Sequence, residues 1–139
     1  MSPEAKIAIV GAATVFITIT VFVVKVVIRR APLKVKRHKT QKSWKELQKF
    51  CADKTTWPKA LESADVLLDK ALIKRGFKGR NMGERLVSAQ REFTDNDGIW
   101  FAHKLARKAV EDAELKLKEK DVKEALLGIG QGLKDLGAL

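Results

Sequence analysis

The side chains best suited to chemistry lie on one predicted helix and in one glycine-rich loop. The helix carries aromatic, basic and acidic residues at spacings of three and four, which puts them on one face: Trp100, His103, Arg107, Glu111 and Glu114. Cations and imidazoles of this kind bind phosphate through charge-assisted hydrogen bonds. We therefore predict a site for phosphate or an RNA backbone formed by Arg75, Lys78, Arg80, His103 and Arg107. In the alternative interpretation, Trp100 packs against a neighbouring helix and the charged residues are solvated.

The patterns that identify common catalytic and metal sites are missing from the sequence. Cys51 is the only cysteine, which excludes a Cys-rich metal site within one chain. The acidic turn at residues 95–98 does not fit a calcium loop, because the bidentate glutamate position falls on Ala106 or Lys104. The glycines at 128–132 would need a preceding strand to bind phosphate, so we interpret them as close helix packing or a kink. No catalytic residue, metal or cofactor is predicted.

Apolar residues at helical spacing predict an all-α fold, in which an N-terminal transmembrane helix precedes a bundle of four to five helices at residues 43–139. Ser43 and Glu46 form a capping box for a first short helix. Further helices are expected at residues 55–75, 81–92, 98–117 and 120–136. The last of these has a stripe of predicted core residues: Val122, Ala125, Leu126, Ile129, Leu133 and Leu136.

The N-terminal segment has the length and composition of a membrane span. No charge occurs from Ile7 to Val24, and continuing to Ile28 gives about the 20 residues that cross ~30 Å of hydrocarbon. A cleaved signal peptide is the competing interpretation, but it needs basic residues before the apolar run and small residues after it. Here Arg29 and Arg30 stand where cleavage would fall. We predict an uncleaved single-pass anchor at residues 1–28, in the cell membrane, with the N-terminus outside and the C-terminal domain in the cytoplasm.

Positive charge is concentrated directly after this segment. The chain has a net charge of +11, and residues 25–45 contain nine basic side chains and no acidic one. Pro32 and the lack of apolar periodicity predict an extended basic linker at residues 29–42. Its charges can orient the anchor and contact an anionic leaflet, or they can contact nucleic-acid phosphates. The predicted membrane-surface residues are Arg29, Arg30, Lys34, Lys36, Arg37 and Lys39.

Four stretches of the chain carry a resemblance to a known group of proteins. They are Trp57 followed by ALESADVLLDKAL, then RGFKGRNMGERL, then WFAHKLARKAVED, and the closing LKDLG. The segment from Trp57 to about Leu136 resembles an uncharacterised bacterial family of membrane-anchored helical domains. That family is similar to the HEPN fold, which binds nucleotides and is often a ribonuclease. Active HEPN members carry an Arg-Asn or similar pair followed by a histidine about one turn later on a helix.

The resemblance implies a helical bundle and nucleotide or RNA binding, but it does not imply catalysis. At the matching positions this chain has Ala106 for the arginine, Arg107 for the asparagine and Glu111 for the histidine. Metal-free RNA cleavage needs a group that moves the 2′-hydroxyl proton and cations that stabilise the phosphorane. A carboxylate at Glu111 instead repels phosphate, so the motif is degenerate.

Two functions of different classes are therefore expected. The first is a membrane-tethered helical interaction or scaffold module, which binds a protein partner at the cytoplasmic face or forms a homo-oligomer through Trp100 and its neighbours. The alternative is an RNA- or nucleotide-binding HEPN-like domain that is catalytically inactive or a cryptic ribonuclease. Salt-dependent RNA binding by the glycine-loop cations would separate the two.

Overall fold

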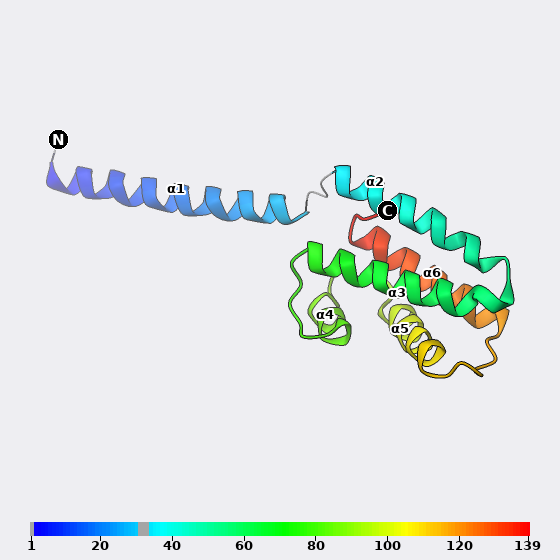
Figure 1. Ribbon diagram of the computed structural model, residues 1–139. Helices are drawn as coiled ribbons and strands as arrows, with labels where there is room; N and C mark the ends of the chain where they lie inside the picture. The colour runs from blue at the N-terminus through cyan, green and yellow to red at the C-terminus, as the bar shows by residue number, and fades with distance from the viewer. Residues whose placement is uncertain (1, 31–33) are drawn as a thin grey trace. The chain divides into compact units, whose positions relative to one another are not determined.

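The computed structural model describes the main chain of residues 2–30 and 34–139, and the side chains of these residues outside the range 27–36. All regular elements in these ranges are helices (Figure 1). The chain divides between Pro32 and Leu33 into two compact units. The first contains α1 (Pro3–Arg30). The second contains five α-helices, so the predicted all-α bundle is confirmed: α2 (Lys34–Gln48), α3 (Trp57–Lys74), α4 (Met82–Ser88), α5 (Asn96–Glu111) and α6 (Glu119–Asp135).

Helix α1 is long and apolar enough to cross a membrane. Its stretch from Pro3 to Val26 has 24 residues, a mean hydropathy of 2.6 and no buried residue. The hydroxyls of Thr14 and Thr18 donate to the carbonyl oxygens of Gly11 and Val15 at 2.8 Å, which satisfies them inside the helix. A signal sequence near an N-terminus has the same length and composition. Helix α1 therefore has the length and hydropathy to span a membrane, and its retention as an uncleaved anchor stays a prediction.

The expected extended linker at residues 29–42 is wrong at both ends, because Arg29 and Arg30 are the last residues of α1 and residues 34–42 form the first part of α2. Lysine, arginine and glutamine have high helix propensity, which outweighs the missing apolar periodicity. Packing adds to this, since Leu47 is buried and the ring of Trp44 lies against Gly130 of α6. Ser43 consequently lies inside a helix and does not cap one.

The side chains of Arg29, Arg30, Lys34 and Lys36 lie outside the described residues, and so does Pro32. Arg37 and Lys39 are described and exposed, and Arg37 donates a hydrogen bond to the carbonyl oxygen of Leu139 at 2.9 Å.

The helix ends of the bundle follow from local capping. Helix α3 has Pro58 in its first turn and ends before Gly76, whose φ of +82° suits glycine. Asn81 caps α4 by accepting from the amide of Glu84 at 2.9 Å, and Asp95 caps α5 by accepting from the amide of Gly98 at 2.9 Å.

Helix α5 ends at Glu111, six residues before the expected end at 117. The reason is an Asx-type turn, in which the carboxylate of Asp112 accepts from the amide of Glu114 at 3.0 Å and draws the chain out of the helix. Helix α4 is likewise shorter than expected and ends at Ser88 rather than near 92.

Helix α6 lies against α2, α3 and α5, and its glycines allow the close approach to α2 and α5. A Cβ on Gly128 would stand 2.7 Å from the carbonyl oxygen of Gly98, at the start of α5. A Cβ on Gly130 would meet the ring of Trp44 on α2 at 3.1 Å, and one on Gly132 would meet Cδ1 of Ile99 at 2.9 Å. The prediction of close helix packing at residues 128–132 is therefore confirmed.

Candidate binding site

His103 and Asp65 form a polar link between α5 and α3. The Nδ1 atom of His103 lies 3.0 Å from both carboxylate oxygens of Asp65, and each side chain is 13% exposed. Trp100, one turn earlier on α5, contacts the imidazole edge-on with 6.1 Å between ring centroids. The aromatic and imidazole stripe predicted from the sequence thus exists, and it is fixed to a carboxylate that the sequence analysis did not single out.

An imidazole beside a carboxylate can act in acid–base catalysis, but no group that His103 could activate is hydrogen-bonded to it among the described residues. A carboxylate beside Nδ1 favours the tautomer with its proton on Nδ1, which leaves the lone pair of Nε2 as an acceptor. Among the described residues, Nε2 makes no hydrogen bond to a hydroxyl or thiol that it could activate. The geometry therefore favours a structural tie between two helices.

We expect Asp65→Ala to lower the free energy of unfolding of the bundle by about 2 kcal/mol, the typical contribution of a hydrogen bond to a charged group. The loss arises because Nδ1 of His103 is left without a partner at the α3–α5 contact. Urea titration of the full chain in detergent micelles, followed by circular dichroism, measures it. Glu62→Ala, which removes an exposed 3.8 Å pair with Lys59, is the control and should change little. Equal losses in both variants would show that the histidine contact adds nothing.

The three predicted arginine ligands are each engaged within the bundle. Arg75 donates to the carbonyl oxygen of Leu136 at 2.9 Å, where a cation suits the C-terminal end of α6. Arg80 lies 3.1 Å from Glu84. Both the amide and the guanidinium of Arg80 donate to that carboxylate, which lowers the pKa of Glu84.

On α5, Arg107 donates to Glu111 at 3.0 Å, and both side chains are exposed. Lys78 is exposed, and its main-chain carbonyl accepts from the hydroxyl of Ser88 at 2.7 Å. No hydrogen bond or ion pair in the described part of the chain joins any two of the five predicted phosphate ligands. Three of the four cations among them lie within 4.0 Å of a carboxylate, since the guanidinium of Arg75 also lies 4.0 Å from Glu92.

The shortest ion pair among the described residues of the bundle was not predicted from the sequence. Arg85 on α4 reaches both carboxylate oxygens of Asp69 on α3, at 2.6 and 2.8 Å, and also donates to the carbonyl of Gly79. The hydrogen bond to Asp69 raises the pKa of the Arg85 guanidinium. The sequence did contain a signal for these contacts. Asp65 and Asp69 are four residues apart and flank the buried stripe of α3, where they can reach side chains of neighbouring helices.

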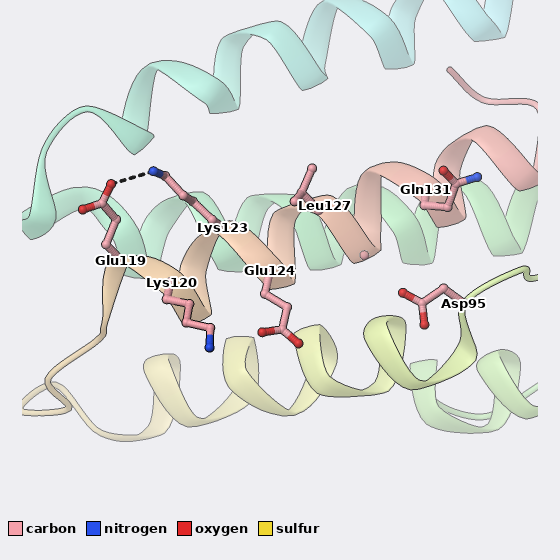
Figure 2. Close-up of a pocket in the computed structure, with 8 residues that line it drawn as sticks. Asp95, Glu119, Lys120, Lys123, Glu124, Leu127 and Gln131 are labelled. Atoms are coloured by element: carbon pink, nitrogen blue, oxygen red, sulfur yellow. Dashed lines mark ion pairs between the residues drawn. The ribbon is translucent and has the colours of Figure 1, made fainter.

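The outer face of α6 forms a shallow groove, here called the α6 groove, with a volume of about 890 Å³. Figure 2 shows Lys120 and Glu124 on the edge of α6 nearer to α5, and Leu127 on the other edge. Leu127 is 75% exposed, the largest exposed fraction of any large apolar side chain described in the bundle. The groove is lined by Asp95, Glu119, Lys120, Lys123, Glu124, Leu127, Gly128 and Gln131.

One charged pair in the α6 groove is already made. Lys123 lies 2.8 Å from Glu119, and their hydrogen bond raises the pKa of Lys123 and lowers that of Glu119. No ion pair involves Lys120 or Glu124 among the described residues, and the exposed Leu127 lies beside them. Within those residues there is also no group of three histidine, cysteine or acidic side chains that could hold a metal ion.

Comparison with known proteins gives no relatives: no protein-family model, curated protein or solved structure matches this chain. The resemblance to HEPN domains therefore stays a prediction.

Proposed function

We propose that this chain is a membrane-tethered interaction module, in which α1 is an uncleaved anchor and the bundle binds a protein partner at the cytoplasmic face. The observation that carries the proposal is the α6 groove, where Leu127 is exposed beside charged side chains that lack partners. The polar residues best suited to chemistry are, by contrast, mostly engaged with each other or with nearby carboxylates.

The chemistry of the α6 groove fits an amphipathic helix of a partner protein. Lys120, Glu124, Leu127 and Gln131 recur at spacings of four, three and four, so they follow one face of α6 for about 16 Å, with Lys120 and Glu124 on its edge nearer to α5 and Leu127 on the other. A helix in such a groove places an apolar residue over Leu127, and charges opposite in sign next to Glu124 and Lys120. This pattern of alternating charge also selects the direction in which the partner helix lies.

The membrane part of the proposal rests on α1 and on the charge that follows it. The span from Pro3 to Val26 is 24 residues long, has a mean hydropathy of 2.6 and contains no buried residue, which suits a helix whose apolar surface faces lipid. The basic residues from Arg29 to Lys45 lie after the span, which favours the cytoplasmic side for the bundle.

Photo-cross-linking in native membranes tests the proposal. A photoreactive amino acid at position 127 of the full chain should give a discrete protein adduct, whereas the same group at Val110, which is 59% exposed on α5, should not. Glu124→Lys should remove the adduct at 127, and Glu114→Lys, an exposed acid outside the groove, should leave it. Adducts of equal yield at both positions, or none at 127, would contradict a partner in the groove.

The identity of the adduct separates the alternatives. An adduct destroyed by ribonuclease supports the RNA-binding alternative, and RNA affinity that falls steeply with salt and with substitution of Arg75, Lys78, Arg80 and Arg107 would support it further. An adduct of twice the mass of the chain identifies a second copy. A protease-sensitive adduct of any other mass supports a protein partner.

A further inference from the structure

Helix α2 presents a stripe of basic side chains on the face that it does not bury. Its packed face contains Thr40 and Leu47, both buried, and Trp44. At 100° per residue, the opposite face is occupied by His38, Lys42, Lys45 and Lys49, at spacings of four, three and four. All four are exposed, and Lys49 lies in the 3-10 turn (η1, Lys49–Cys51) that continues the helix.

The three lysines of this face differ from three arginines of the bundle in whether a carboxylate pairs with them. Arg80, Arg85 and Arg107 each have a carboxylate within 3.1 Å. In the described part of the chain, no carboxylate pairs with Lys42, Lys45 or Lys49, and α2 contains a single acid, Glu46. We call these three residues the α2 lysine stripe. It is a row of three exposed lysines on a helix, and the only acid of α2, Glu46, lies beside it without forming an ion pair among the described residues.

The stripe is also close to the membrane span along the chain. Four peptide units separate Arg30, the last residue of α1, from Lys34, the first of α2. Four units reach at most about 14 Å, so the start of α2 cannot leave the neighbourhood of the headgroups if α1 spans a bilayer. Lysines near an anionic surface are attracted to it by ~1 kcal/mol each, within about a Debye length of the headgroups.

We propose that the α2 lysine stripe docks the bundle on an anionic leaflet by binding lipid phosphates and carboxylates. The bundle then lies on the membrane by one defined face and is not free on a flexible linker. The inference rests on the proposed function only in taking α1 as a membrane span. It differs from the linker expectation, because the contacting residues belong to a folded helix and extend to Lys49.

Lysine acylation of the full chain in lipid nanodiscs tests the docking. Discs expose both leaflets, so the result does not depend on orientation in the cell or on the protein partner. We expect Lys42 and Lys49 to react about tenfold more slowly in discs that contain phosphatidylglycerol than in discs of phosphatidylcholine alone. The exposed Lys104 and Lys108 of α5 serve as internal references and should react equally in both. High salt should restore the rates, because it screens the attraction.

A single substitution sharpens the test. Lys45→Gln should reduce the ratio of docked to undocked bundle by about fivefold, and the protection of Lys42 and Lys49 should fall accordingly. Lys104→Gln is the matched control, which removes the same charge from α5 and should leave the protection unchanged.

Two results would overturn the proposal. One is equal reactivity of the stripe in both kinds of disc. The other is protection of the stripe by added RNA in phosphatidylcholine discs with none by anionic lipid, which would reassign it to nucleic acid. Neither result depends on whether position 127 forms a partner adduct, so the two proposals can fail separately.

Discussion

Gly128→Ala should lower the free energy of unfolding of the bundle by about 3 kcal/mol, although alanine is the better helix former. The new Cβ would stand 2.7 Å from the carbonyl oxygen of Gly98 and 2.9 Å from its carbonyl carbon. Both atoms belong to the main chain, so no side-chain rotation can relieve the contact. The helices α5 and α6 must move apart, and the apolar side chains between them lose contact.

Gly130→Ala provides the matched control two residues away on the same helix. Its Cβ would meet only the ring of Trp44, at 3.1 Å, and a side chain can shift where a main chain cannot. The intrinsic gain of about 1 kcal/mol from glycine to alanine should offset most of that contact. Urea titration by circular dichroism in micelles, where α1 stays helical, compares the two variants. Equal stability of both would show that α5 and α6 are not in close main-chain contact at Gly128.

Ile99→Ala should be the most destabilising of the apolar truncations on α5, at about 3–4 kcal/mol. Ile99 is 1% exposed, and its Cδ1 atom lies beside the site where Gly132 has no side chain. Shortening it opens a cavity between α5 and α6 that the surrounding helices cannot close. The same titration measures the loss, and Val110→Ala, on the exposed side of α5, should cost far less.

A double-mutant cycle tests whether the loss comes from this contact. Gly132→Ala alone places a Cβ 2.9 Å from Cδ1 of Ile99, and Ile99→Ala removes that atom. The double variant should therefore be more stable than the sum of the single losses predicts, by about 1 kcal/mol. Strictly additive losses would mean that a Cβ at position 132 does not contact the side chain of Ile99.

The elements that the sequence predicted well are those whose signals are local. Pro58 and Gly76 mark the ends of α3, and Asn81 and Asp95 cap α4 and α5, because each acts on residues within one turn. The apolar stripe of α6 was also predicted nearly in full, and only Leu126 is partly exposed among its expected core residues.

The elements that the sequence did not predict depend on contacts between distant residues. The start of α2 looked like a linker because its long-range contact, the hydrogen bond from Arg37 to the carbonyl oxygen of Leu139, joins residues 102 positions apart. His103 pairs with Asp65 over 38 residues and Arg85 with Asp69 over 16. No periodicity within one helix contains that information. The candidate phosphate ligands were chosen by residue type and helix face, although Glu111 stands four residues after Arg107, a spacing at which opposite charges pair on a helix.

The position of α6 has a consequence for the order in which the protein forms. Helix α6 is synthesised after α2, α3 and α5, the helices it contacts, and three glycines make it a weak helix on its own. The bundle therefore cannot close its core until α6 has left the ribosome. At ~5–20 residues per second, the apolar segment of α1 has been exposed for several seconds by then. If α1 is the membrane anchor that we propose, it can be delivered to the membrane before the bundle folds, and the folded domain never has to be moved with an exposed apolar helix.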